Sequence, residues 1–331
     1  MKIVITGGSG LIGGCLSRVL LEKGHTVFHL SRWVSNNQTH KKDFTSGKNI
    51  FWSNSQVLEN ADAVIHLAGA NVAKPWTKSY KKEILESRTR GTKALMDAVA
   101  ACVQPPKHII SASGIGYYPE GVTDILTEDS ASGDGFLSEV CRSWEQSLFN
   151  NNPKGLSISV VRTGLVLSNQ SKIVGAARAQ FLLSGMVGSV GSPANRWSWI
   201  HLEDLCHIYL ALIEGRLFPG IYNGVAPTPC SQGEFGLAYE RYPSLNLPKY
   251  LIYAQVQWWL AKRLNGLIRG LGIRKRPVVS RFLIKWLWGE RSVIALTDQF
   301  VSAQKLLDQG FCYQYPTIDT AMQNLQCRPE I

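Results

Sequence analysis

The chain has 331 residues, a formal net charge of +11, 45% hydrophobic residues and 18% charged residues. This length and composition exclude a disordered chain and allow either one large α/β unit with an appended lobe or two domains. Seven scattered cysteines without a Cys-x-x-Cys pair exclude a disulfide framework and a zinc site. We therefore expect reduced thiols and, because no secretory signal is recognisable, a cytoplasmic protein.

The first stretch predicts a strand, a glycine turn and a helix. An apolar run at 2–6 leads into glycines, and a helical pattern follows from 11 to about 22. Gly8, Gly10 and Gly13 fit the spacing G-x-G-x-x-G, and Gly7, Gly10 and Gly13 fit G-x-x-G-x-x-G. Both spacings serve a tight turn that brings backbone amides against a pyrophosphate. We therefore predict a dinucleotide-binding turn at 7–13.

The second predicted strand indicates which dinucleotide is bound. It covers 26–30 and ends in Ser31 and Arg32, near the position where such a fold meets the adenosine ribose. An NAD site usually places Asp or Glu here, but the chain has no acid between His25 and Lys42. A hydroxyl and a guanidinium suit a 2′-phosphate, so we predict NADP(H).

Strand and helix patterns then alternate, which favours a parallel sheet covered on both faces. After a polar loop and a short strand near 50–52, we predict strands at 62–69, 107–113 and 156–164 and helices at 78–102 and 139–149. The strand at 62–69 ends in the small residues Ala68 and Gly69, which let a nucleotide lie against the backbone.

Motifs spread over nearly the whole chain carry a resemblance. They lie at 6–13, 31–32, 66–69, 87–88, 111–118, 127–130, 136–145, 162–164, 199–204 and 305–316. In this order they resemble the extended, or atypical, short-chain dehydrogenase/reductase family. Within it the chain is similar to the NAD(P)-dependent epimerase family proteins, which carry their own C-terminal helical module of the DUF1731 type.

The resemblance implies a Rossmann-like, doubly wound parallel sheet with a smaller, mostly helical C-terminal substrate lobe. Residues 1–170 would form the NADP-binding domain, to which the chain returns at about 197–225. Residues 171–196 and 226–331 would form the substrate lobe, ending in a helical module at 285–327. Relatives are often dimers, so a homodimer is one expected assembly.

Motif and resemblance together predict the cofactor contacts. They are Gly7, Gly8, Ser9, Gly10, Leu11, Ile12, Gly13, Ser31, Arg32, Leu67, Ala68, Gly69, Glu83, Arg88 and Val166. For Arg88, a structural ion pair is the alternative.

The chain departs from the family at the catalytic pair. The general mechanism uses Tyr-x-x-x-Lys, in which the lysine lowers the pKa of the tyrosine. Aligned on the helix glutamate, these positions hold Leu137 and Cys141, which cannot do that work. The family's serine survives as Ser113, whose hydroxyl could donate to a substrate oxygen or simply satisfy a strand end. Tyr117 and Tyr118 are candidates for a substitute proton donor, with packing as the alternative.

The segment 249–288 is basic and aromatic. It contains nine Lys or Arg residues and no acid. Apolar positions at helical spacing predict a basic amphipathic helical insertion at about 249–280, which could lie on an anionic membrane surface. The alternative is a helix pair that closes the substrate cleft; nucleic-acid binding is not expected, because no recognised reading element accompanies the charge.

Two hypotheses of different classes remain open. The first is an NADP-dependent, epimerase-like or dehydratase-like oxidoreductase acting on an unknown small molecule, with Ser113 and Tyr117 or Tyr118 in place of the missing pair. The second is a non-catalytic NADPH-binding sensor. We expect no metal, since His201 and Asp204 lack a second ligand nearby and belong to a turn that organises structure in this family.

Overall fold

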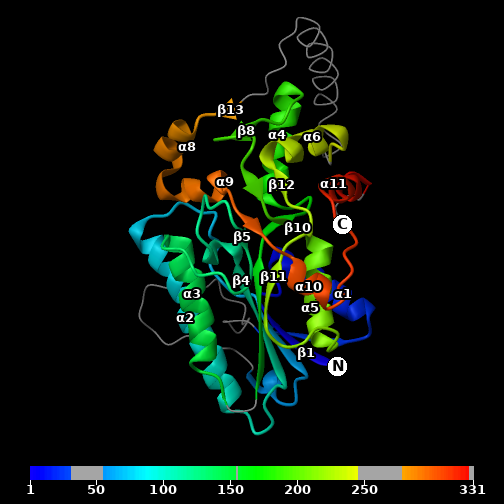
Figure 1. Ribbon diagram of the computed structural model, residues 1–331. Coiled ribbons are helices and arrows are strands. Elements are labelled where there is room, and N and C mark those ends of the chain that lie inside the picture. The colour runs from blue at the N-terminus through cyan, green and yellow to red at the C-terminus, as the bar shows by residue number, and fades with distance from the viewer. Residues whose placement is uncertain (31–54, 154–155, 245–277, 328–331) are drawn as a thin grey trace, which may run out of the picture.

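Six parallel strands form the central sheet of the computed structural model, which describes residues 1–30, 55–153, 156–244 and 278–327 (Figure 1). In spatial order the strands are β11 (Ile221–Gly224), β6 (Ser157–Thr163), β4 (His108–Gly114), β3 (Ala63–His66), β1 (Lys2–Thr6) and β2 (Thr26–Leu30). The parallel sheet predicted from the alternating pattern is confirmed. The short strand expected near 50–52 lies outside the described residues.

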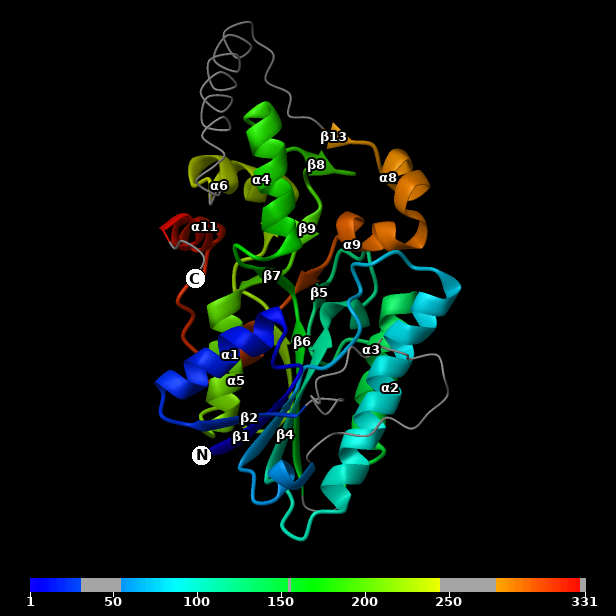
Figure 2. The same cartoon turned by 180° about the vertical axis from the view of Figure 1, so that it is seen from behind.

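Helices cover both faces of the sheet (Figures 1 and 2). On one face α1 (Leu11–Glu22) packs beside α5 (Leu202–Ile213), and on the other α2 (Lys78–Ala100) packs beside α3 (Phe136–Phe149). Successive side chains of a strand point to opposite faces, so Ile3 and Ile5 join the core under α1 and α5 while Val4 joins the core under α2. The doubly wound, Rossmann-like fold is therefore confirmed.

The sheet reverses its direction of growth beside β1. The chain passes from β1 to β2 on one side of β1, and then to β3 on the other side. A switch of this kind opens a crevice at the carboxyl ends of the strands, where open α/β sheets bind their ligands. The glycine turn after β1 lies at this crevice.

A smaller lobe continues from the end of the sheet (Figure 1). Its helices α4 (Lys172–Ser184), α6 (Gln232–Arg241) and α11 (Ile318–Cys327) share one apolar cluster with Trp199. Short strand pairs join them: β7 (Leu165–Leu167) with β10 (Trp199–His201), β9 (Arg196–Trp197) with β12 (Cys230–Ser231), and β8 (Ser189–Val190) with β13 (Val278–Val279). This lobe is mostly helical, as the resemblance implies.

The chain then returns toward the sheet. It forms α8 (Arg281–Trp288), α9 (Val293–Leu296), β14 (Phe300–Val301) and α10 (Gln304–Asp308), and β14 pairs with β5 (Ile125–Leu126). Short 3-10 helices occur at η1 (Ser55–Leu58), η2 (Ile115–Tyr117) and η3 (Gly289–Ser292). Among the described helices, none combines the length and apolar character needed to cross a membrane.

Candidate cofactor and substrate site

The turn after β1 requires residues without a side chain. Gly7 has a φ of +74°, and a Cβ on it would lie 2.9 Å from the carbonyl carbon of Leu67. A Cβ on Gly13 would lie 2.4 Å from the carbonyl oxygen of Gly7, and one on Gly8 would lie 2.6 Å from the His29 ring. The turn, helix α1 and the end of β3 thus pack against one another with no room for side chains at these glycines, as in a dinucleotide-binding site.

The amino end of α1 is open to an anion. The amide of Gly10 donates to the carbonyl of Gly7 at 3.0 Å and closes the turn, while Ser9 is exposed. No side chain caps α1, and no acidic residue lies in its first turn. The early amides, including those of Leu11 and Ile12, and the positive end of the helix dipole can therefore meet a diphosphate.

The end of β3 is fixed by buried hydrogen bonds. The Thr6 hydroxyl oxygen lies 2.7 Å from Nδ1 of His66 and accepts from the backbone amide of Ala68 at 3.3 Å. The neighbouring apolar cluster brings together three predicted cofactor contacts: Ile12, Leu67 and Val166. Ser31 and Arg32, the residues predicted to meet the 2′-phosphate, lie outside the described residues.

Arg88 of α2 covers Gly69 beyond the end of β3. Its Nη1 donates to the carbonyl oxygens of Ala70 and Ile84, both at 3.1 Å, and its Cζ lies 4.9 Å from the centre of the Trp144 ring. No ion pair within the described part of the chain joins Arg88 to Glu83 or to another acid. Burial lowers the pKa of Arg88, as expected for an enclosed cation whose charge is not balanced nearby.

A cavity of about 240 Å³ lies over the carboxyl ends of β4 and β6, and we call it the strand-end cavity. Arg88, Ser113, Leu137 and Cys141 are among its lining residues. Leu137 and Cys141 stand one helical turn apart on α3, so the residues aligned with the family's tyrosine and lysine face the same space as Ser113. Burial raises the pKa of Cys141 to about 11, which keeps its thiol protonated at neutral pH.

Ser113 belongs to a buried polar network. Its Oγ donates to Oε1 of Glu145 at 2.7 Å, and Glu145 accepts from Nε and Nη2 of Arg162 at 3.0 and 2.8 Å. The side chains of Arg162 and Glu145 are only 3% and 8% exposed. Burial by itself would lower the pKa of Arg162, but the hydrogen bonds and charge of Glu145 raise it. The Ser113 hydroxyl is therefore oriented by a buried ion pair.

The two candidate tyrosines pack against Arg162. Nη1 of Arg162 donates to the Tyr118 hydroxyl at 2.9 Å, which donates to Oδ1 of Asn223 at 2.7 Å. Burial raises the pKa of Tyr118 to about 12, so its phenol is neutral at physiological pH. The Tyr117 ring lies 3.6 Å from the guanidinium carbon of Arg162. Neither tyrosine is among the residues that line the strand-end cavity.

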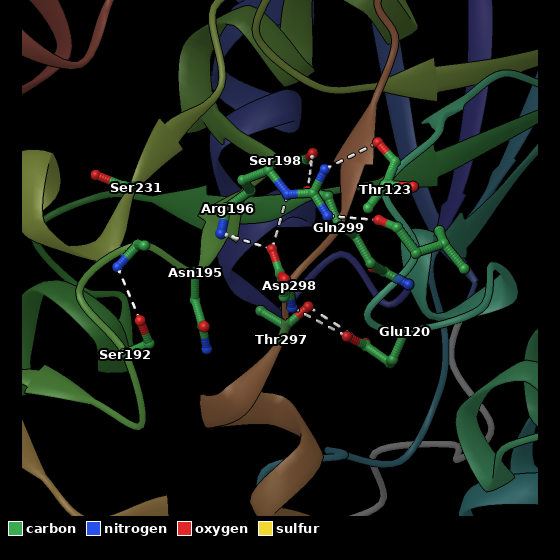
Figure 3. A network of polar contacts seen from close by, with 12 residues as sticks. Glu120, Thr123, Ser192, Asn195, Arg196, Ser198, Ser231, Thr297, Asp298 and Gln299 are labelled. Carbon is green, nitrogen blue, oxygen red and sulfur yellow. Dashed lines mark hydrogen bonds and ion pairs between the residues drawn. The ribbon is translucent and has the colours of Figure 1, made fainter.

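The C-terminal segment forms part of the wall of the strand-end cavity. Asp298 accepts from Nε and the backbone amide of Arg196 at 2.8 and 2.9 Å (Figure 3). Glu120 accepts from the Thr297 hydroxyl at 3.2 Å and from the Asp298 amide at 3.1 Å. These contacts hold Thr297 and Gln299 in the cavity wall. Partial burial works against ionisation of Asp298, but the hydrogen bonds from Arg196 hold its pKa below the usual value.

His201 and Asp204 organise the turn into α5. Nδ1 of His201 accepts from the amide of Glu203 at 3.2 Å, and the Asp204 carboxylate accepts from the amides of Gln314 and Tyr315 at 2.8 and 3.0 Å. Across the described ranges, no group of three or more His, Cys, Asp or Glu side chains is placed to hold a metal ion.

Sequence reasoning did not find the Glu145–Arg162 pair or the C-terminal wall. A signal for the pair was present, because Arg162 interrupts an apolar strand and Glu145 lies on the face of α3 that also buries Cys141 and Leu148. The wall left no comparable signal, since Gln299 meets Tyr118 and Leu296 meets Asn195 across more than a hundred positions of the chain.

Comparison with known proteins identifies the family. The family described as "NAD dependent epimerase/dehydratase family" matches residues 3–223, which is more than half of the chain. The chain belongs to the NAD-dependent epimerase/dehydratase family. A second family, described as "Domain of unknown function (DUF1731)", matches residues 279–325. The resemblance stated from the motifs, including its C-terminal module, is therefore confirmed.

Members of the family align along nearly the whole chain. Epimerase family protein SDR39U1 of Bos taurus is 29% identical over 98% of this chain and 99% of its own, and epimerase family protein YfhF of Bacillus subtilis is 28% identical over 98% of each. The crystal structure of human epimerase family protein SDR39U1 with NADPH has a TM-score of 0.78 at 26% identity, covering 98% of this chain and 99% of that one. The nucleoside-diphosphate sugar epimerase of Corynebacterium glutamicum has a TM-score of 0.70 at 27% identity, covering 98% of this chain and 57% of its own.

Proposed function

We propose that this protein is an NADP(H)-dependent short-chain oxidoreductase of the epimerase/dehydratase type that acts on a small molecule. The glycine turn carries the proposal, because a Cβ on Gly7 or Gly13 would strike backbone atoms, and the bare main chain at these positions can approach a diphosphate closely. Ser31 and Arg32 favour the phosphorylated cofactor, and the human relative solved with NADPH supports that choice.

The residues present fit a dinucleotide that extends from the turn to the strand-end cavity. When bound, NADP(H) would supply the hydride donor or acceptor. The open end of α1 would hold the diphosphate, and Leu67 and Ala68 would line the path along β3. Arg88, which has no acidic partner among the described residues, would contact the cofactor's ribose or phosphate oxygens.

We assign to Ser113 the hydrogen bond with the reacting group of the substrate. The Ser113 proton already points to Glu145, so its oxygen can accept a hydrogen bond from a substrate hydroxyl. Leu137 and the protonated thiol of Cys141 offer no base at the positions of the usual pair, and Tyr118 is neutral. When a substrate hydroxyl is oxidised, its proton would pass to the Ser113 oxygen while the Ser113 proton passes to Glu145, and the same relay run in reverse would protonate the oxygen of a carbonyl that NADPH reduces.

A turnover experiment tests the enzyme. NADPH-loaded protein is mixed with a panel of carbonyl compounds while the absorbance of the reduced nicotinamide is followed. We expect oxidation with at least one compound and its loss in Ser113→Ala. Ser147→Ala is the control, because the Ser147 hydroxyl donates only to the carbonyl of Ser143 in its own helix, at 2.7 Å. Tight binding without oxidation across the panel would instead favour the sensor.

Calorimetry tests the cofactor. We expect NADPH to bind more tightly than NADH, and Arg32→Glu to abolish this preference because it replaces the guanidinium by a repelling carboxylate. Absence of NADPH uptake, or an unchanged preference in Arg32→Glu, would contradict the assignment.

A further inference from the structure

A second cavity, of about 460 Å³, lies in the C-terminal lobe, and we call it the lobe cavity. Its walls are mainly apolar and come from several elements. They include Ile173 and Ala177 of α4, Phe235 of α6, Ile284 and Trp288 of α8, and Trp197. The volume and the apolar walls are typical of a site that encloses a small organic molecule.

The described charged residues of the lobe cavity are all positive. Lys172 and Arg291 line it, and no Asp or Glu is found among the described lining residues. Nη1 of Arg291 donates to the carbonyl oxygen of Ala73 at 3.3 Å, and its guanidinium carbon lies 4.8 Å from the centre of the Trp288 ring. No described acid forms an ion pair with Lys172 or Arg291. The cavity therefore combines an apolar interior with two cations that are free to meet an anion.

The wall of the lobe cavity is poorly suited to a sugar. Gln232 uses both ends of its amide within the protein, since Oε1 accepts from the Val190 amide at 2.8 Å and Nε2 donates to the Ala295 carbonyl at 3.1 Å. Oε1 of Gln180 accepts from the Gly188 amide at 2.9 Å. Few groups remain for the many hydroxyls of a sugar, and burying them without partners would be costly.

The lobe cavity adjoins the strand-end cavity. Leu165 and Ile294 line both. A molecule whose body fills the lobe cavity can therefore extend past Leu165 toward Ser113 and Arg88.

We propose that the lobe cavity binds the apolar body of an organic carboxylate, and that an apolar carboxylic acid is the substrate class of this protein. Arg291 and Lys172 would bind the carboxylate, and the far end of the molecule would enter the strand-end cavity. This inference rests on the proposed oxidoreductase function for its catalytic meaning, but the binding itself can be measured without turnover.

Dodecanoate and its neutral analogue dodecanol provide the probes, used below micelle-forming concentrations with calorimetry on the full chain. We expect dodecanoate to bind roughly tenfold more tightly than dodecanol, because only the carboxylate gains charge-assisted hydrogen bonds. Arg291→Gln should remove most of this difference. Equal binding of the two probes would overturn the proposal.

A matched pair of α4 variants places the binding in the lobe cavity. Ala176 and Ala179 are both exposed on α4, but only Ala176 lines the cavity. We expect Ala176→Phe to block dodecanoate and Ala179→Phe to leave it unchanged. Equal binding by both variants would show that dodecanoate sits elsewhere and would overturn the proposal.

NADPH titration of the same samples separates this inference from the proposed function. Protein that binds NADPH but not dodecanoate would refute the substrate class and leave the cofactor assignment intact. Protein that binds dodecanoate but not NADPH would refute the cofactor assignment and leave the binding of an apolar carboxylate in the lobe cavity intact. Ala176→Phe should retain NADPH binding, which also shows that this variant is folded.

Discussion

Removing the positive charge of Arg88 should weaken the binding of the cofactor. Arg88 lines the strand-end cavity and pairs with no described acid, so Arg88→Gln should weaken NADPH roughly 10- to 100-fold, as expected for one charged hydrogen-bond donor. Arg90→Gln is the control, since Arg90 lies on the same helix, is exposed, and pairs with Glu86 at 3.1 Å. Calorimetry measures both; equal affinities would remove Arg88 from the cofactor site.

Cys15 of α1 should be the reactive thiol among the partly buried cysteines. A hydrogen bond from Cys206, together with the positive charge of Arg18, lowers the pKa of Cys15 to about 7, although partial burial opposes this. Burial raises the pKa of Cys102, so that thiol should react slowly at neutral pH.

Alkylation with iodoacetamide, followed by peptide mass spectrometry, measures this difference. The rate at Cys15 should rise with pH and reach its half-maximum near pH 7, because the thiolate is the nucleophile. In Cys206→Ala the midpoint should move to higher pH. A midpoint that stays in place would mean that Cys206 does not stabilise the thiolate.

At the scale of single residues, the sequence predicted what depends on local chain geometry. The glycines of the turn are identifiable because their spacing expresses a backbone requirement, and the structure shows that a Cβ at Gly7 or Gly13 has no room. The hydrogen bond of the Ser113 hydroxyl was not predictable from the sequence. Its partner Glu145 is 32 residues away, and only the packing of α3 on the sheet brings the two side chains together.

Among elements, α3 and β6 are joined by the buried Glu145–Arg162 pair. Glu145→Gln leaves the Arg162 charge without compensation, so we expect a loss of about 3–5 kcal/mol in the free energy of unfolding. Asp97→Asn is the control, because it breaks an exposed pair with Lys93 whose contribution should be below about 1 kcal/mol. Urea denaturation measures both; equal losses would refute the structural importance of the buried pair.

Helix α8 presents two faces. Ile284 and Trp288 line the lobe cavity, whereas Phe282 and Trp286 are 79% and 73% exposed. The remainder of the basic segment, up to residue 277, lies outside the described residues, so the predicted contact with an anionic membrane rests here on α8 together with the charge of the segment.

We expect the protein to pellet with anionic vesicles more than with neutral ones. Lys285→Gln should lower the partition about fivefold, since one basic residue near such a surface contributes about 1 kcal/mol. Lys93→Gln, on the exposed face of α2, should leave it unchanged. Equal pelleting with neutral and anionic vesicles would contradict the membrane contact.

Element types were largely predictable, because apolar periodicity and glycine punctuation report local structure. The helix predicted at 11–22 ends where α1 ends, and the strand predicted at 156–164 corresponds to β6 at Ser157–Thr163. Short strands such as β14 and β5 were not predictable, since two residues give no period and their pairing joins segments that are far apart in the chain.

At the scale of the whole molecule, the strand-end cavity takes its walls from both the sheet and the C-terminal segment. Arg196 and Asp298 bind each other within the lobe, and Glu120 binds the same segment from the loop that follows β4. The strand-end cavity is therefore built from both the sheet and the C-terminal segment, and the lobe cavity opens beside it. Neither cavity could be predicted from motifs, because its walls come from segments distant in sequence.

The wall formed by Val293, Ile294, Thr297 and Gln299 has a consequence for biosynthesis. A nascent chain contains the glycine turn from the start of translation, yet the strand-end cavity has all its walls only after translation has passed residue 299. A chain that stops prematurely near residue 290 would lack this wall of the cavity.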